Sequence, residues 1–117
     1  MQFVVLHHTG FGEAHYDVML ELEPGGLLAT WRSPIWPLQH QTPLTPLKAH
    51  RRDYLTYEGE LSDGRGRVKR VAAGDYELIS RGERAIVVRL PGKPPEEWEI
   101  VGHPAAGAIV LCTLARL

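Results

Sequence analysis

The fold is decided by one stretch of the chain: DVMLELE (residues 17–23), PGG (24–26) and LLATW (27–31). In its first part, apolar residues at positions 18, 20 and 22 alternate with positions 17, 19, 21 and 23, three of which are acidic. This period of two is typical of a β-strand with one buried face. The proline and two glycines then interrupt the run, and a second apolar run follows. The sequence therefore predicts a β-hairpin.

Further along the chain, short β-rich runs are separated by glycine or proline turns. They cover residues 67–72, 76–80, 85–90, 97–101 and 108–114. Regularly spaced short strands are typical of small barrels and sandwiches. Segment 33–45 is rich in proline, which disfavours a long helix and predicts an ordered loop over one end of the barrel. We therefore predict a mainly β protein, a small single-domain β-barrel with a proline-rich loop and little helix.

Length and composition narrow the class of protein. The chain has 117 residues, of which 44% are hydrophobic and 23% charged, and this fits one globular domain over residues 1–117. The formal charge of -1 points to no particular class of partner, so binding of nucleic acid would need a local patch of positive charge. The single cysteine, Cys112, excludes an internal disulfide and favours a reducing compartment. The apolar start MQFVVL (1–6) lacks a basic flank, so we expect a cytoplasmic protein with no membrane partner.

The motif His15-Tyr16-Asp17 carries the first chemical signal. On a strand, side chains two residues apart point to the same face, so His15 and Asp17 would lie together. Two neutral imidazoles and one carboxylate suit a divalent transition metal and leave positions open for water or a substrate oxygen. Either His8 or His7 would supply the second imidazole. On the pattern alone, a hydrogen-bonded histidine without a metal is the more common arrangement.

A second cluster, HRRDY, spans residues 50–54. His50 is a candidate proton donor or phosphate contact, and Tyr54 offers a hydroxyl group. Arg51 and Arg52 can each bind a phosphate through two hydrogen bonds. The competing interpretation for the two arginines is a solvated turn.

A third cluster, GRGRVKR (64–70), places four cations after a glycine turn. On a strand, Arg67 and Lys69 would share one face and, with Arg65, could follow a nucleic-acid backbone. The alternative is an exposed edge strand whose charges prevent aggregation. The sequence leaves both interpretations open.

Spaced motifs follow one another in one order between residues 3 and 77. They are HYDxxLEL (15–22), Leu28 and Trp31 before Pro34, HxxDYxxYEG (50–59), GxGxV (64–68), Gly74 and YE (76–77). In this order they resemble the 3′-phosphoesterase domain of bacterial ATP-dependent DNA ligase D, with weaker agreement toward the C-terminus. The resemblance implies a compact β-barrel with a manganese-dependent site. It also implies trimming of 3′ ends in non-homologous end joining, by removal of a terminal ribonucleoside and then of the 3′ phosphate.

The resemblance assigns the metal ligands. His15 and Asp17 match the second histidine and the aspartate of the family. The first histidine of the family falls at Thr9 in this chain, so His8 serves as that ligand if the loop holds one extra residue. His7 is the alternative ligand. The implied cofactor is a divalent metal, Mn²⁺.

The resemblance also assigns the phosphate site. His50 matches the histidine that contacts the scissile phosphate, and Tyr54 matches a tyrosine of the same site. Three cations of the family are missing, because Met19, Ile35 and Thr42 stand in their places. Each charge-assisted hydrogen bond lost in this way is worth about 1.5–3 kcal/mol. The metal-binding half therefore resembles the family more closely than the phosphate-binding half.

Nearby cations are candidates to replace the missing ones. They are Arg32 beside Trp31, and Lys48, Arg51 and Arg52 around His50. The expected partners are nucleic-acid 3′ ends such as primer-template DNA. Because the family domain is usually joined to ligase and polymerase modules, separate ligase or polymerase repair proteins are further expected partners.

Two other functions remain open at this point. One is a non-catalytic module that binds nucleic-acid ends through Arg65, Arg67 and Lys69. The other is an iron-dependent oxygenase, in which His103 would complete a two-histidine, one-carboxylate set and Arg116 would bind an acid. We rank the oxygenase below the other two functions, because the chain is short for that fold and its co-substrate pocket.

Overall fold

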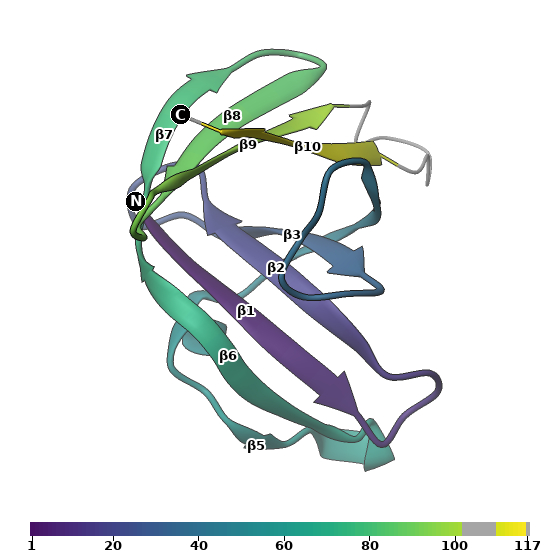
Figure 1. The fold of residues 1–117 in the computed structure, drawn as a ribbon. Coiled ribbons are helices and arrows are strands. Elements are labelled where there is room, and N and C mark those ends of the chain that lie inside the picture. Colours follow the sequence, from purple (N-terminus) through teal and green to yellow (C-terminus); the bar gives the residue numbers. More distant parts are fainter. Residues whose placement is uncertain (102–109, 117) are drawn as a thin grey trace.

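A computed structural model describes residues 1–101 and the strand backbone of residues 110–116. These residues contain no α-helix, only strands and two short 3₁₀ turns (Figure 1). The elements are β1 (Gln2–Thr9), β2 (His15–Glu21), β3 (Leu28–Ser33), β4 (Thr42–His50), η1 (Arg52–Leu55), β5 (Gly59–Glu60), η2 (Ser62–Gly64), β6 (Arg67–Asp75), β7 (Glu77–Arg81), β8 (Ala85–Leu90), β9 (Glu96–Val101) and β10 (Val110–Arg116). None of the described residues forms a helix that is long and apolar enough to cross a bilayer.

The strands pair in the order β5-β6-β1-β2-β3-β4-β10-β9-β8-β7, and every pairing is antiparallel. Sheet A contains β5, β6, β1, β2, β3 and the later part of β4, and sheet B contains the start of β4, β10, β9, β8 and β7. Strand β4 joins the two sheets, because its later residues pair with β3 and Thr42 to Leu44 pair with β10. In Figure 1, sheet B lies above sheet A. The predicted mainly β class and the hairpin of β2 and β3 are confirmed. No pairing among the described strands joins β5 to β7, so a closed barrel is not confirmed.

The proline-rich segment is shorter than predicted. We expected a loop over residues 33–45, but β4 begins at Thr42 and contains Pro43 and Pro46. Proline cannot donate to the ladder, but its φ suits an extended strand, so the strand forms with some of its N–H bonds missing. The loop is therefore confined to residues 34–41.

Strands β1 and β2, at the centre of sheet A, contribute buried residues to both faces of the sheet. One face packs against sheet B in a core of Phe3, Val5, Val18, Leu20, Trp31, Val88, Leu90, Trp98 and Ile100, among others. The opposite face forms a second apolar cluster of Val4, Leu6, Met19, Leu28 and Val68, against which Tyr54, Leu55 and Leu61 pack. Alternation alone would leave positions 19 and 21 at the surface. Both are buried because η1 covers this face.

Glu21, at the end of β2, is buried in a network of hydrogen bonds. Its carboxylate accepts from the Gln2 backbone N–H at 3.1 Å and pairs with the Arg52 guanidinium, which also donates to the Gly26 carbonyl at 3.1 Å. The Tyr76 hydroxyl donates to the Glu21 carbonyl. Burial raises the pKa of Tyr76 to about 12. This network fixes η1, and with it the cluster HRRDY, against sheet A.

This network predicts a loss of stability in acid. Hydrogen bonding from Arg52 lowers the pKa of the Glu21 carboxyl from its usual 4.5. The unfolded chain therefore takes up a proton near pH 4.5, before the folded protein does, so the stabilisation is complete above that pH. It is lost as the pH falls through the lowered pKa of the folded state.

The measurement is the free energy of urea unfolding as a function of pH, for the wild type and for Glu21→Gln. We expect the two curves to run parallel above the usual pKa and to converge below it. The other carboxylates contribute equally to both proteins. Curves that keep a constant separation at every pH would contradict this role of Glu21.

Candidate metal centre and its cavity

The β1–β2 hairpin brings three candidate ligands together. In its register His8 lies directly opposite His15, and Asp17 follows two residues later on the same face as His15. His8 Nδ1 lies 3.2 Å from His15 Nε2, and His15 Nε2 lies 3.3 Å from an Asp17 carboxylate oxygen. All three ligand atoms lie within 4.8 Å of one another. His15 and Asp17 are buried, and His8 is half-buried.

Two backbone carbonyls determine which nitrogen of each imidazole carries the hydrogen. His8 Nε2–H donates to the Arg65 carbonyl at 2.7 Å, and His15 Nδ1–H donates to the Glu13 carbonyl at 3.0 Å. A carbonyl only accepts, so each of these nitrogens carries a hydrogen. In the neutral rings the other two nitrogens therefore present lone pairs to each other. Carbonyl partners of this kind orient the histidine ligands of metal sites.

The arrangement fits a divalent cation. Two imidazole lone pairs and a carboxylate converge, and Asp17 Oδ1 is buried with no hydrogen-bond partner among the described residues. Without a positive charge between them, such groups repel, and a buried unpaired carboxylate oxygen is costly. Separations of 3.2–3.8 Å are those of neighbouring ligands on one ion with bonds of about 2.0–2.2 Å. The donor set therefore suits a transition metal such as Mn²⁺, Fe²⁺ or Zn²⁺.

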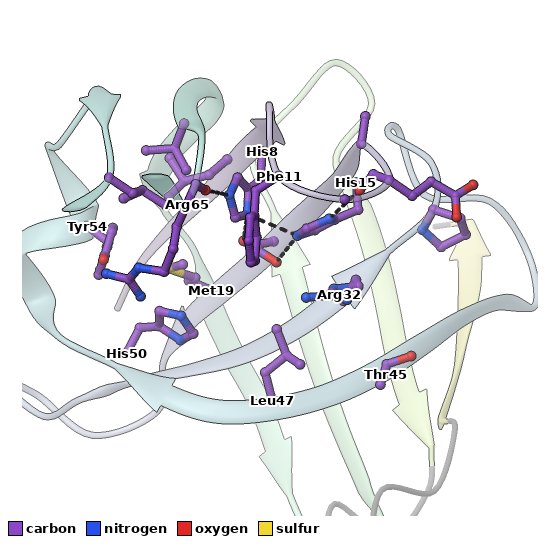
Figure 2. Close-up of a pocket in the computed structure, with 18 of the residues that line it drawn as sticks. His8, Phe11, His15, Met19, Arg32, Thr45, Leu47, His50, Tyr54 and Arg65 are labelled. Carbon is purple, nitrogen blue, oxygen red and sulfur yellow. Dashed lines mark hydrogen bonds and ion pairs between the residues drawn. The ribbon is translucent and has the colours of Figure 1, made fainter. Parts of the chain in front are cut away.

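The candidate ligands lie in the wall of a cavity of about 620 Å³. The predicted residues His50, Tyr54, Arg32 and Arg65 line the same cavity (Figure 2). The structure thus brings His50 and Tyr54 to the site, although they follow the motif HYD by more than thirty residues. A cavity of this size is typical of small-ligand sites.

His50 and Tyr54 form a pair on the side of the cavity formed by β4 and η1. Their rings meet edge to face, with centroids 5.5 Å apart. His50 Nδ1–H donates to the Lys48 carbonyl at 2.8 Å, so Nε2 remains the atom that can exchange a proton. The Tyr54 ring packs on the second apolar cluster. Both side chains are therefore held in place before any ligand binds.

Several predicted residues do not line the cavity. His7 lies on the opposite face of β1, stacked on Tyr16 with ring centroids 4.6 Å apart, so the register favours His8 as the ligand. Arg52 pairs with Glu21, at the other end of β2 from His15. Arg51, like Lys48, is exposed outside the cavity.

The cations of β6 are exposed as a row. Arg67 and Lys69 flank the buried Val68 and share the outer face of the strand, as the sequence predicts for a strand. Arg67 pairs with Glu60 on β5 at 3.0 Å. Strand β6 pairs with β1 over residues 67–75 but with β5 only at Arg67 and Val68, so from Lys69 onward it is an edge that no described strand covers, as the alternative interpretation expected. Neither cation faces the cavity.

The three positions that lack the family's cations have different surroundings. Met19 lines the cavity and is 1% exposed in the second apolar cluster. Ile35 lies outside the cavity, in the proline-rich loop. The buried Thr42 hydroxyl donates to the Gln39 carbonyl at 2.7 Å and accepts from the Gln39 N–H at 2.8 Å, which closes that loop. Met19 alone of the three is therefore part of the site.

Sequence reasoning missed the hairpin loop and the residues around it. Phe11 lines the cavity mouth and is 55% exposed between Gly10 and Gly12, which both have positive φ. The pattern Gly-Phe-Gly between two histidine motifs was the available signal. The roles of the Arg65 and Glu13 carbonyls left no signal, because a backbone group carries no sequence information.

Three predictions concern residues at the C-terminal end. His103, the distal ligand of the oxygenase hypothesis, lies outside the described residues. Cys112 and Arg116 belong to β10, whose backbone alone is described, and Cys112 pairs with Thr42. The comparisons with known proteins add no family assignment, since no family model and no curated protein matches the chain.

Proposed function

We propose that the protein is a metal-dependent phosphoesterase that acts on 3′ termini of DNA or RNA. One observation carries the proposal: five residues that the resemblance to the ligase D domain singles out, from two distant segments, line one cavity. They are His8, His15, Asp17, His50 and Tyr54. The geometry by itself supports a metal site with an adjacent histidine, and the resemblance supplies the substrate.

In this proposal His8, His15 and Asp17 hold a divalent cation, most simply Mn²⁺. When bound, such an ion polarises a phosphate oxygen and lowers the pKa of water. In hydrolysis the water oxygen bonds to phosphorus, the P–O bond to the leaving group breaks, and a proton reaches the leaving oxygen. His50 would donate that proton from Nε2, because its Nδ1 is held by the Lys48 carbonyl, and the proton that the attacking water loses would pass to solvent. Tyr54 would orient the phosphate, and Arg32 stands at the cavity as an exposed cation.

The biological setting extends the same proposal. We infer that the protein works in DNA repair in the cytoplasm, where its single cysteine stays reduced. Separate ligase or polymerase proteins would then complete the repair of an end that it has trimmed.

The test is an assay on primer-template DNA with a 3′-terminal ribonucleoside or a 3′ phosphate, with and without Mn²⁺, alongside calorimetric titration of the ion. We expect one Mn²⁺ per chain and metal-dependent shortening or dephosphorylation of the primer. Salt-sensitive DNA binding without product would instead favour the end-binding module. Absence of both Mn²⁺ binding and product would overturn the proposed function.

Gly66 should be needed to position the metal site. It has φ +84°, and a Cβ there would lie 2.1 Å from the Thr9 carbonyl oxygen and 3.1 Å from the Phe11 nitrogen. Gly66→Ala would therefore push the β1–β2 loop away from Arg65, whose carbonyl holds His8. We expect Mn²⁺ affinity to fall about tenfold or more, as when other outer partners of metal ligands are lost.

Gly64→Ala is the matched control for this variant. Its φ of +67° is strained in the same way, but a Cβ there would meet nothing within 4 Å. We expect it to lower stability by about 1 kcal/mol and to leave Mn²⁺ affinity unchanged. Equal affinity losses in both variants, measured by titration calorimetry, would refute the positioning role of Gly66.

A further inference from the structure

We propose that the site selects a monoanionic phosphodiester carrying a planar apolar group, such as a nucleoside, over a dianionic terminal phosphate. This inference rests on the proposed function and names the substrate class of the same site. It follows from what lies next to the three candidate ligands inside the cavity.

An apolar floor begins immediately beside the ligands. Leu6 precedes His8 by two residues on the same face of β1, and Met19 follows Asp17 in the same way on β2. Two residues of a strand span about 6.6 Å, so the floor starts one side-chain spacing from the ligands. Val68, Leu61 and Leu47 continue it. A phosphate at the metal would therefore place one substituent over apolar side chains.

The buried end of the cavity carries little positive charge. A divalent ion held by two neutral imidazoles and the Asp17 carboxylate has a net charge of +1, which balances one phosphate charge. The floor residues supply no further cation, since Met19 and Leu6 are fully buried hydrocarbon or thioether. A second phosphate charge would lie beside apolar surface, with His50 and Tyr54 as polar neighbours but no permanently charged side chain on the floor, which is unfavourable.

The two arginines of the cavity are exposed and do not remedy this deficit. Arg65 donates to the Ser62 carbonyl at 3.0 Å and to the Ser62 hydroxyl at 3.1 Å, so its guanidinium is held at η2 in contact with solvent. Arg32 has no ion pair within the part of the chain that the structure describes, but it is exposed on β3. Glu13, which also lines the cavity, adds an exposed negative charge to this side of the molecule. Exposed charges of this kind are screened by solvent and contribute little.

Aromatic side chains mark where a planar group would lie. Phe11 at the cavity mouth is more than half exposed, and in Figure 2 it lies next to His8 and His15. Tyr54 packs on the floor from the opposite side. Exposed and half-buried aromatic rings are the usual stacking platforms for bases. A diester between two nucleosides supplies both the single charge and the ring.

Binding of three small probes to the Mn²⁺-loaded protein tests the two parts of the inference separately. Methyl phenyl phosphate has one charge and one ring, phenyl phosphate has two charges and one ring near pH 8, and dimethyl phosphate has one charge and no ring. By titration calorimetry we expect methyl phenyl phosphate to bind about tenfold tighter than each of the others, equivalent to about 1.4 kcal/mol. Phenyl phosphate binding equally well would overturn the charge argument, and dimethyl phosphate binding equally well would overturn the apolar one.

A variant with an added cation should abolish the selection. Leu47 is a half-buried floor residue on β4, so Leu47→Arg can place a guanidinium in the cavity without entering the core. We expect it to lower the preference for methyl phenyl phosphate over phenyl phosphate about tenfold. Leu27→Arg adds the same charge at a site that is 62% exposed, outside the cavity, and should leave the preference unchanged.

The outcomes separate this inference from the proposed function. If Mn²⁺ does not bind, the proposed function fails, and the inference falls with it. If Mn²⁺ binds and primers are trimmed, but phenyl phosphate binds as tightly as the diester, only the inference fails. On primers, the same selection predicts faster removal of a terminal ribonucleoside than of a terminal phosphate.

Discussion

Replacing Asp17 by asparagine should make the metal-free protein more stable and abolish its response to Mn²⁺. The Asp17 carboxylate is buried, and its Oδ1 has no hydrogen-bond partner among the described residues. It also faces the lone pairs of His8 Nδ1 and His15 Nε2. An asparagine amide can donate to those lone pairs and removes a buried charge. Satisfying such groups is worth about 1–3 kcal/mol.

The wild type should gain stability from Mn²⁺ that the variant cannot gain. A ligand that binds only the folded state stabilises it by about 2.7 kcal/mol at a hundred times its dissociation constant. With Asp17→Asn we expect no such gain and no phosphoesterase activity, because the carboxylate ligand is missing. A residue kept for function at the expense of stability behaves in this way.

Thermal unfolding near pH 8, where free histidine is neutral, with and without Mn²⁺ measures both effects. Asp53→Asn, which removes an exposed carboxylate in η1, is the matched control and should change neither value. If Asp17 were only the ion-pair partner of a protonated histidine, the asparagine variant would be less stable, and Mn²⁺ would not raise the wild-type melting temperature. That result would refute the metal centre.

Replacing His50 by alanine should remove activity and leave Mn²⁺ binding intact. His50 lines the cavity, but it is not one of the three clustered ligand residues. A positioned proton donor or acceptor contributes about 100- to 10,000-fold to rate, so we expect kcat to fall by a factor in that range. Mn²⁺ affinity should stay within about twofold, because no ligand changes.

Two further variants serve as controls for His50→Ala. His40→Ala removes an exposed histidine of the proline-rich loop and should leave the rate unchanged. His50→Gln retains a hydrogen-bonding side chain of similar reach, so it should preserve phosphate binding and still lose the rate. Full activity in His50→Ala, or a large loss of Mn²⁺ affinity, would remove His50 from the proton-transfer role.

The strands were largely predictable because their residues alternate. The run at 85–90 corresponds to β8, since turn residues bound it on both sides, whereas β6 continues three residues past the predicted run 67–72, because residues 73–75 pair with β1 instead of turning. Strand β4 was missed because Pro43 and Pro46 make its sequence look like a loop. Its pairing with two sheets comes from tertiary structure, which overrides local propensity. A barrel was expected from strand spacing, but spacing does not determine whether the last strand meets the first.

The site was predictable where it depends on spacing along one strand. His15 and Asp17 share a face by alternation, and the resemblance placed His50 and Tyr54 in the same site. The choice between His8 and His7 could not be read from the sequence, since it depends on the β1–β2 register. Arg52 was expected at the phosphate, but its ion pair with Glu21 takes it out of the cavity. A local cluster of cations does not reveal which acid each one contacts.

Because β1 and β2 have buried residues on both faces, an odd or even residue number decides whether a side chain faces the cavity or the core between the sheets. Along β1, even-numbered residues such as Leu6 and His8 serve the cavity, whereas odd-numbered ones such as Val5 serve the core between the sheets. On β2 the parity is reversed. A one-residue shift of β1 in register would therefore exchange the two sets and disrupt the candidate metal site and the core together.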